Sequence, residues 1–476
     1  MTVDVAIIGG GVSGLATAVA LTRQGRRVVV LERQVTAGGN ARSERIGGFL
    51  MERGPSAIAA ASSRADAISG LSALAEGRCG LGEDVRRRYL VRQGRLHGTA
   101  THQMAFLTSD LLSVPGRLRL MTETVVPRRR GTGGETVAEF ASRRFGREFA
   151  DRVVDPLVGG VYAGRSDELS VSAVFPALVA LEREFGSVAL GAIRRHLRGG
   201  RMPGSRLYSW RNGIGTLPST LARELGAAVR TGVAVNRIRS RGTGFAIDVG
   251  PAGEVIASTV VLATQPHVAA QILEPIDPEG AAATGGIVAP PLAVVFLGFR
   301  RSEVAHPLDG LGFLSPTSEG RFLNGAQFCS TMFPGRSPDG YVSIAVYFGG
   351  GRAPELGDRP AEELVDLARA ELRDLIGADG RPVLARAHHW PRGLPQYRLG
   401  HEDLIAQIRT IGHRQPGLFV TGNYLGGISV AACLDGAVDT ADRVVAFLED
   451  RKTREPVISL PSTLPVPSRN MAGYPG

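Results

Sequence analysis

The residues of this sequence that could first do chemistry are three glycines near the start of the chain. Gly9, Gly11 and Gly14 have GxGxxG spacing, and a β-branched run over residues 3–8 precedes them. A helical pattern and a second apolar run follow, and that run ends at Glu32, 18 residues after Gly14. In such a unit the first glycine permits a turn, the second lets the backbone approach a pyrophosphate, and the third lets the helix pack on the strand. The helix N-terminus stabilises the phosphates and the acid binds ribose hydroxyls. The sequence therefore predicts a βαβ unit that binds a dinucleotide.

The stretch after this unit favours FAD over NAD. Gly38 and Gly39 form a tight loop directly after the second predicted strand, and Arg42 lies just beyond it. Flavoproteins of the amine oxidase superfamily carry a similar stretch, in which the loop and the arginine pass along the pyrophosphate. The same resemblance implies that three later residues approach the isoalloxazine ring: Gly54, Pro55 and Ser56.

Composition limits what else the chain can be. It has 476 residues, 43% of them hydrophobic, which is enough for two or three domains around large cores. The net charge of +10 comes almost entirely from arginine, because Lys452 is the only lysine. No recognition motif accompanies this charge, so we expect no nucleic acid partner, whereas a peripheral contact with an anionic membrane fits. The three cysteines show neither metal nor disulfide spacing.

Changes of pattern along the chain divide it into segments. Residues 86–204 show helical periods, strand signals return over 205–265, and residues 266–392 mix strands with one charged helix. We therefore expect an α/β (α+β multidomain) protein. Its discontinuous Rossmann-like FAD-binding domain would comprise residues 1–85, 205–265 and 393–450. A helical domain would be inserted at 86–204, and a mixed-sheet substrate domain would span 266–392. We expect a disordered tail at 451–476, because that segment is rich in Pro, Ser and Thr.

Three further stretches carry a more specific resemblance. "VDPLVGGVYAGRSDELSVSAVFPALVALEREFGSV", "HHWPRGLPQYRLGH" and "LFVTGNYLGGISVAACLDGA" resemble the protoporphyrinogen oxidase family, and the similarity runs from residue 3 to about residue 448. The family implies a flavin domain built from separate pieces, a substrate domain and a helical membrane-facing domain. It also implies that the second glycine-rich loop, more than four hundred residues after the first, returns to the same flavin.

The resemblance implies the chemistry as well. The substrate would be a porphyrinogen, from which FAD takes six electrons as three hydrides, with dioxygen as the acceptor and hydrogen peroxide as the product. We expect no catalytic base and no metal ligand. The expected partners are the porphyrinogen, dioxygen, an anionic membrane surface and a second copy of the chain. The expected place is the cytoplasm, at the inner face of the cell membrane.

Site residues follow from the same resemblance. Arg88, immediately before Tyr89, matches an arginine that pairs with a substrate propionate, and a guanidinium fork suits a carboxylate. Apolar positions that would sandwich the macrocycle are Leu297, Leu314 and Phe328. The expected cofactor-binding residues are Gly9, Gly10, Gly11, Val12, Ser13, Gly14, Glu32, Arg33, Gly38, Gly39, Asn40, Arg42, Gly54, Pro55, Ser56, Val235, Trp390, Gly422, Ile428, Ser429 and Val430.

Two departures from the family pattern keep alternatives open. Asn40 stands where the family often has a basic residue, and "GISVAAC" lacks the usual polar residue before the cysteine. A coproporphyrinogen III oxidase, or a flavin amine oxidase or desaturase of specialised metabolism, remains compatible with the sequence. So does a non-enzymatic protein that resembles the GDP-dissociation inhibitors.

Overall fold

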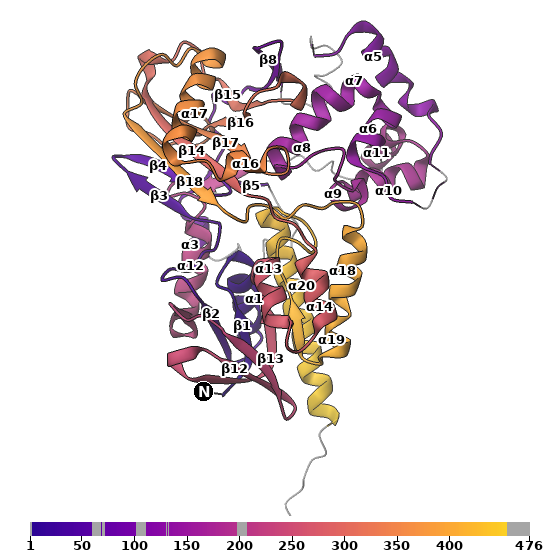
Figure 1. Ribbon diagram of the computed structural model, residues 1–476, viewed down its shortest axis with the longest axis vertical. Coiled ribbons are helices and arrows are strands. Elements are labelled where there is room, and N and C mark those ends of the chain that lie inside the picture. Colours follow the sequence, from indigo (N-terminus) through magenta and orange to yellow (C-terminus); the bar gives the residue numbers. More distant parts are fainter. Residues whose placement is uncertain are drawn as a thin grey trace, which may run out of the picture.

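The computed structural model describes residues 2–59, 68, 72–100, 111–129, 131, 133–197 and 207–454. Two sheets of seven strands each form separate bodies. In Figure 1 the first sheet and its helices lie at the bottom, the second sheet lies at the upper left, and a group of helices lies at the upper right. We call these the first-sheet domain, the second-sheet domain and the helical domain.

The first sheet is parallel at its centre. Its order is β10-β2-β1-β13-β12-β11, and β19 pairs with the second half of β13. The pairs β10–β2, β2–β1, β1–β13 and β13–β19 are parallel, whereas β12 and β11 are added antiparallel. The strands are β1 (Thr2–Ile8), β2 (Val28–Glu32), β10 (Val229–Thr231), β11 (Arg237–Arg241), β12 (Gly244–Asp248), β13 (Glu254–Leu262) and β19 (Leu418–Val420).

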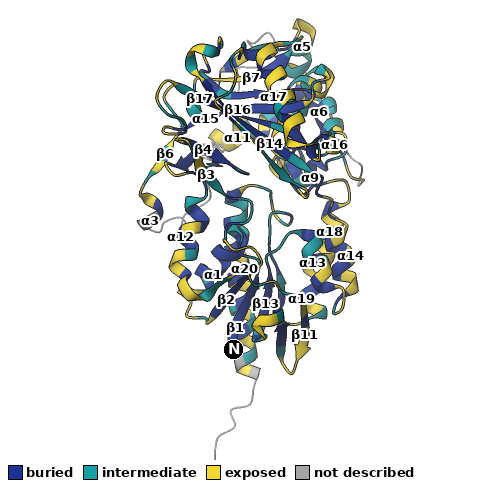
Figure 2. Cartoon of the chain, turned by 60° about the vertical axis from the view of Figure 1, so that its left-hand side comes forward, coloured by how far each residue is buried: buried dark blue, intermediate teal, exposed yellow. Residues whose placement is uncertain are grey.

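Helices cover both faces of this sheet, which explains why β1 and β2 are mostly apolar and largely buried, with Thr2, Asp4 and Glu32 as their polar residues. One face packs on α1 (Val12–Arg23), α12 (Thr216–Leu225) and α20 (Val430–Arg454). The other packs on α13 (Pro266–Leu273), α14 (Pro278–Gly285), α18 (His401–Arg409) and α19 (Ile411–Arg414). Figure 2 shows the strands buried between helices whose outer faces are exposed. The predicted α/β fold class is confirmed.

The second sheet is mixed and has the order β18-β14-β17-β16-β15-β7-β8. Its strands are β7 (Arg87–Arg92), β8 (Arg95–Ala100), β14 (Leu292–Arg300), β15 (Gly310–Leu314), β16 (Leu323–Phe328), β17 (Tyr341–Gly349) and β18 (Leu384–Trp390). One face packs against α17 (Ala361–Ile376) in a continuous apolar core. Short helices α15 (Cys329–Met332) and α16 (Pro354–Gly357) lie beside it.

A hairpin of the first-sheet domain reaches onto the other face of the second sheet. It consists of β3 (Ser43–Ile46) and β4 (Phe49–Glu52). Phe49 packs with Val294 and Phe296, and a Cβ on Gly298 would lie 2.8 Å from its ring. Glu52 forms a buried ion pair with Arg336 of the second-sheet domain. This hairpin therefore fixes how the two domains face each other. A small sheet, β5 (Ile58–Ala59), β9 (Leu207–Trp210) and β6 (Arg78–Gly80), lies nearby.

The helical domain follows the second-sheet hairpin in sequence. Its elements are α5 (Val114–Met121), the 3-10 turn η1 (Thr122–Val125), α6 (Val137–Phe145), α7 (Arg147–Phe149), the π-helical turn η2 (Ala150–Val154), α8 (Asp155–Tyr162), α9 (Val171–Val174), α10 (Pro176–Phe185) and α11 (Val188–Leu197). A buried charge network connects these helices, with Arg144 between Glu123 and Glu182.

The structure places several domain boundaries differently from the sequence expectation. Residues 87–100 form β7 and β8 of the second sheet rather than helices, so the helical domain begins after them. Residues 266–285 form α13 and α14 on the first sheet, so the second-sheet domain resumes only at β14. Helix α20 continues to Arg454, and the expected disorder after it lies outside the described residues. Helical periods and strand alternation could not show which sheet each element joins, because that depends on partners distant in sequence.

Candidate functional site

The turn between β1 and α1 has the geometry of a pyrophosphate site. Gly9 has φ +108°, and a Cβ there would lie 2.7 Å from the Ala263 carbonyl oxygen. A Cβ on Gly14 would lie 2.0 Å from the Gly9 oxygen, so helix and strand are in direct contact. A Cβ on Gly11 would meet nothing nearer than the Cα of Gly39, at 3.9 Å. The fold therefore requires the first and third glycines, whereas the second leaves a free approach to the N-terminus of α1, which has no side-chain cap.

The predicted second glycine loop closes over this turn. The Gly38 amide donates to the Gly10 carbonyl at 2.8 Å, and Gly11 and Gly38 form an isolated β-bridge. Arg42 follows, and one of its terminal nitrogens donates to the Thr36 carbonyl at 3.0 Å. Its Nε is buried and has no hydrogen-bond partner among the described residues. A buried guanidinium nitrogen requires an acceptor, so these residues fit an anionic phosphate group.

Glu32 lies at the carboxyl end of β2, where a ribose would bind. Its Oε2 accepts from the Gly10 amide and its Oε1 from the Gln34 amide, both at 2.7 Å. The Val233 amide donates to the Glu32 carbonyl at 2.9 Å, and this brings Val235 to the same edge of the sheet. Arg33 is exposed beside it. Burial, with Arg392 and Arg33 nearby, lowers the pKa of His267 at the start of α13.

The C-terminal glycine loop returns to this same edge. Strand β19 pairs with β13, and the Thr421 amide donates to the Leu262 carbonyl at 2.9 Å. Gly422 therefore lies at the carboxyl end of β13. Val12 and Val430 pack in one apolar cluster, and Figure 1 shows α1 beside α20. Burial raises the pKa of the Cys433 thiol, in the first turn of α20, to about 11, and the nearby Ser13 side chain, in the first turn of α1, acts in the opposite direction. The first turns of the two helices are therefore adjacent.

Residues 423–430 lead into α20. The Ser429 hydroxyl accepts from the Ala432 amide at 3.1 Å, which caps the helix, and Ile428 packs against the apolar cluster of the helical domain. The positive end of this helix thus lies beside that of α1. The two glycine-rich loops at opposite ends of the sequence form one site.

The expected flavin-ring segment lies between the first-sheet domain and the second sheet. A Cβ on Gly54 would lie 2.3 Å from the Asn40 carbonyl oxygen, so Gly54 to Ser56 pass close to the glycine loop. The Trp390 indole donates to the Arg53 carbonyl at 2.7 Å. His388 packs edge-to-face on Trp390, with ring centroids 4.5 Å apart. Burial, followed by Arg53, lowers the pKa of His388 to about 4, and its Nε2 is buried without a partner among the described residues.

The register of the second sheet identifies the face that turns toward this segment. One row across it reads His388, Val294, Tyr347, Gly325, Leu314, Leu90 and His97. Arg88 lies two residues before Leu90 and therefore projects from the same face. Arg88 is exposed and has no ion-pair partner within the described segments. The β3–β4 hairpin covers one end of this face, and α8 covers Leu314, whose Cδ2 would lie 2.2 Å from a Cβ on Gly160.

Two of the four predicted substrate residues lie on the face opposite that of Arg88 and Leu314. Leu297 and Phe328 are fully buried beneath α17, in the row Leu297, Ile344 and Phe328. Their strand neighbours Phe296 and Gln327 lie on the face of Arg88 instead, where Phe296 packs beneath the β3–β4 hairpin and Gln327 accepts a hydrogen bond from the Tyr347 hydroxyl at 3.1 Å. Both faces of β14 and β17 are buried and apolar, so no alternation of polar and apolar residues in the sequence shows which side chains share a face. Strand register was the missing information.

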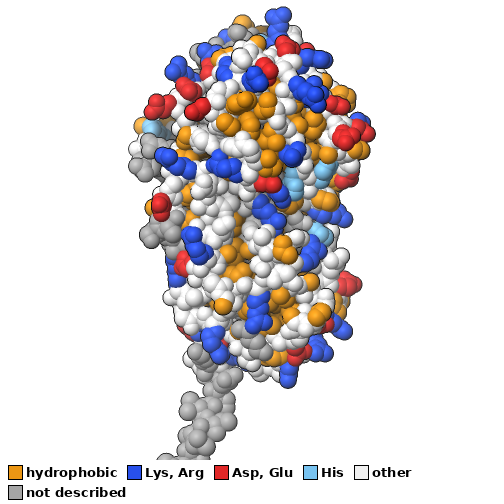
Figure 3. Space-filling view, turned by 90° about the vertical axis from the view of Figure 1, so that its left-hand side faces the viewer, with side chains coloured by type: hydrophobic (Ala, Val, Ile, Leu, Met, Phe, Trp, Pro, Cys, Tyr) orange, Lys and Arg blue, Asp and Glu red, His pale blue; other side chains and the backbone are white. Residues whose placement is uncertain are grey.

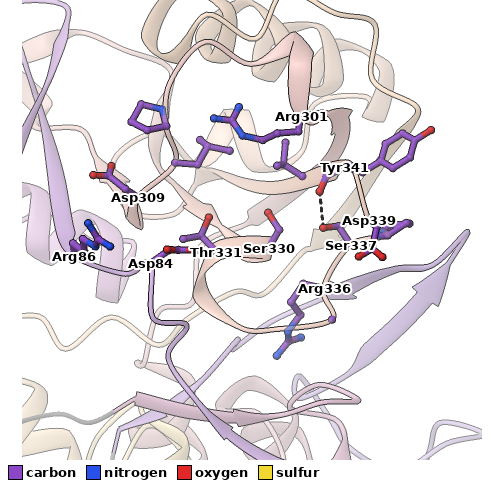
Figure 4. Close-up of a pocket in the computed structure, with 16 residues that line it drawn as sticks. Asp84, Arg86, Arg301, Asp309, Ser330, Thr331, Arg336, Ser337, Asp339 and Tyr341 are labelled. Carbon is purple, nitrogen blue, oxygen red and sulfur yellow. Dashed lines mark hydrogen bonds between the residues drawn. The ribbon is translucent and has the colours of Figure 1, made fainter.

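A separate polar hollow of about 550 Å³ lies on the second-sheet domain. Figure 4 shows it lined by Asp84, Arg86, Asp309, Ser330 and Thr331, among others. Arg336 also borders it, but its guanidinium points away, toward Glu52. None of the predicted cofactor or substrate residues lines this hollow.

Two observations concern partners. On the face in Figure 3, arginines are scattered among acidic and apolar side chains rather than gathered into one patch. Within the described segments, no helix combines the length and the apolar character that crossing a membrane requires.

Comparison with known proteins agrees with this geometry. Residues 12–446 match the family "Flavin containing amine oxidoreductase". The chloroplastic protoporphyrinogen oxidase of Oryza sativa subsp. japonica is 30% identical over 94% of this chain and 89% of its own length. The coproporphyrinogen III oxidase of Propionibacterium freudenreichii subsp. freudenreichii is 28% identical over 92% of this chain and 90% of its own.

A crystal structure of a putative protoporphyrinogen oxidase from Exiguobacterium sp. 255-15 shares the fold. Its TM-score is 0.78 at 22% identity, and the match covers 94% of this chain and 99% of that one. The unpartnered Arg42 Nε, the open approach at Gly11 and the adjacent helix ends all fit a flavin dinucleotide. The chain belongs to the family of flavin-containing amine oxidoreductases, and its cofactor is FAD.

Proposed function

We propose that this protein oxidises protoporphyrinogen IX to protoporphyrin IX. Six electrons and six protons leave the macrocycle, three molecules of dioxygen accept them, and three molecules of hydrogen peroxide are released. Relatives that cover almost the whole chain and carry this name support the proposal. A relative of similar identity named coproporphyrinogen III oxidase favours oxidation of coproporphyrinogen III as the second candidate.

The observation that carries the proposal is the position of Arg88 on the face of the second sheet that also carries Leu90 and Leu314. Its guanidinium is exposed and has no ion-pair partner among the described residues, and Leu90 and Leu314 project from the same face. A porphyrinogen has the matching character, because it is a large, mostly apolar ring with carboxylates on its edge. Apolar walls with one or two placed polar groups are typical of sites for such ligands. A guanidinium binds a carboxylate through two parallel hydrogen bonds.

The residues of the chain would bind and orient the reactants. Bound FAD supplies the two-electron acceptor. The first turns of α1 and α20 and Arg42 would hold its phosphates and ring, while Glu32 holds its ribose. Arg88 would hold a propionate and so decide which bridge carbon of the macrocycle faces the flavin. The β3–β4 hairpin and α8 border this face on two sides.

The test is an aerobic assay of the purified yellow protein with protoporphyrinogen IX and coproporphyrinogen III, with amines as the negative comparison. Arg88→Ala loses a charge-assisted pair of about 1.5–3 kcal/mol, so kcat/KM should fall about ten- to a hundredfold. Arg88→Lys should recover only part, since lysine lacks the fork. FAD content should be unchanged, because Arg88 lies on β7, away from the glycine loops.

The matched control is Arg87→Ala. Arg87 precedes Arg88 on the same strand but projects from the other face, where it lies 3.6 Å from Asp309. Its loss should leave kcat/KM within twofold. Oxidation of amines but of neither porphyrinogen would refute the proposal. Faster turnover of coproporphyrinogen III would select the second candidate. Equal losses of kcat/KM in Arg87→Ala and Arg88→Ala would show that Arg88 has no specific role in binding a propionate.

A further inference from the structure

The loop between β19 and α20 is held together by a side chain from outside it. The hydroxyl of Tyr397 donates to the Asn423 carbonyl at 2.6 Å and accepts from the Gly427 amide at 2.9 Å. One oxygen therefore spans the loop and fixes two of its backbone groups. Tyr397 is only 2% exposed, and burial raises its pKa. The hydroxyl keeps its proton at neutral pH, as the bond to Asn423 requires.

The ring of Tyr397 is itself fixed from two sides. His401 stacks on it with centroids 4.1 Å apart and planes 15° apart. Tyr162, the last residue of α8, meets it edge-on at 6.2 Å. Both neighbours hold the ring in one orientation, so the hydroxyl has little freedom to leave the loop.

The main chain around Tyr397 continues this connection into the helical domain. The Ser170 amide donates to the Tyr397 carbonyl at 2.8 Å. The side-chain amide of the preceding residue, Gln396, donates to the Tyr162 carbonyl at 2.9 Å. Three segments distant in sequence, at α8, at Gln396 to His401 and at Asn423 to Gly427, thus meet at one tyrosine.

We propose that Tyr397 is a positioning residue, which sets the backbone of residues 423–428 against the flavin and ties it to α8 on the substrate side. This rests on the proposed function for the substrate side and on the family's FAD for the flavin side. Gly422 and Gly427 have φ angles of +153° and +137°, so the loop backbone is unusual and needs an external constraint. Without the hydroxyl, two partly buried backbone groups lose their partner, and the loop and the first turn of α20 relax.

The test is Tyr397→Phe, which keeps the ring, its stacking on His401 and its contact with Tyr162. Tyr424→Phe is the matched control. Tyr424 lies in the same loop and is fully buried, but its hydroxyl has no hydrogen-bond partner among the described residues. The same substitution therefore removes two hydrogen bonds in one variant and none in the other.

Two readouts need no substrate. Tyr397→Phe should alter the visible absorption band of the bound flavin. It should also raise the dissociation constant for FAD about tenfold, equivalent to about 1.4 kcal/mol. Tyr424→Phe should match the parent in both. With protoporphyrinogen IX, Tyr397→Phe should slow flavin reduction in single turnover about tenfold and leave KM within twofold, a split that simple destabilisation would not produce.

An unchanged flavin band and affinity in Tyr397→Phe would overturn the proposal, as would equal effects of the two variants. If the parent binds FAD but oxidises no porphyrinogen, the proposed function fails while the flavin readouts still decide the role of Tyr397. If Tyr397→Phe does not accumulate, hydrogen exchange in the parent decides. The Gly427 amide should exchange as slowly as the amides of α20, and exchange as fast as at a free loop amide would also overturn the proposal.

Discussion

Gly11→Ala and Gly14→Ala make the same chemical change three residues apart, and the structure predicts opposite consequences. At Gly14 the new Cβ would lie 2.0 Å from the Gly9 carbonyl oxygen, and separations below 3.0 Å are essentially never seen. The helix or the turn must therefore move by about 1 Å. At Gly11 the nearest atom would be 3.9 Å away, and φ is −77°, which alanine adopts readily.

The magnitudes follow from these contacts. Overpacking of this kind costs about 1–3 kcal/mol, and a contact with backbone belongs at the upper end. Alanine returns about 1 kcal/mol of helix propensity, so Gly14→Ala should lower the free energy of unfolding by about 2 kcal/mol. That corresponds to about 4–8 °C in Tm for a domain of this size. Gly11→Ala should change the stability of the flavin-free protein by less than about 1 kcal/mol.

For FAD affinity we expect the opposite ranking, with Gly11→Ala more damaging than Gly14→Ala. The Cβ of Gly11→Ala occupies the space through which a pyrophosphate approaches the backbone. Loss of charge-assisted hydrogen bonds worth about 1.5–3 kcal/mol would raise the dissociation constant for FAD about ten- to a hundredfold. Thermal unfolding of the flavin-free proteins and FAD titration by flavin fluorescence measure the two effects separately. Full FAD affinity in Gly11→Ala, or parental stability in Gly14→Ala, would refute the reasoning.

Three further changes test other parts of the structure. Glu52→Ala leaves the buried guanidinium of Arg336 without its ion-pair partner, so the free energy of unfolding, measured in urea, should fall by about 3–5 kcal/mol. A loss below about 1 kcal/mol would mean that this ion pair does not hold the two domains together. Burial lowers the pKa of folded His388 to about 4, below the ordinary histidine value of 6.5, so the unfolded chain binds the proton first and the free energy of unfolding falls as pH drops from 6.5 to 4. Tm should therefore fall less between pH 7 and pH 5 in His388→Gln than in the parent, and an equal fall would contradict the assignment. Leu118 and Met121 are exposed on α5 beside Arg117 and Arg119, so Leu118→Asp should reduce binding to anionic vesicles, whereas salt-independent binding unaffected by the change would exclude this surface.

Local signals in the sequence were sufficient to predict FAD as the cofactor. The glycine spacing, the acid after the second strand and the Gly38–Gly39 loop each reflect a short-range steric or electrostatic requirement, so they can be read within a few dozen residues. The α/β class followed from the same βαβ pattern. The prediction that the C-terminal glycine-rich loop returns to the first domain depended on the family resemblance, because the sequence of a loop does not show which sheet edge it contacts.

The substrate half depended on tertiary structure. The residues of β7 and β8 were expected in a helical insert, yet they complete the second sheet through pairing with β15, more than two hundred residues away. Leu297 and Phe328 were expected on one wall with Leu314, but strand register places them on the opposite face of the sheet. The link through Tyr397 had no sequence signal, because it joins backbone groups that only folding brings together. The sequence by itself determined the cofactor-binding turn, because its constraints act between near neighbours along the chain. Which residues of the second sheet share a face with Arg88 was decided only by long-range strand pairing, since strands buried on both sides carry no alternation to distinguish their faces.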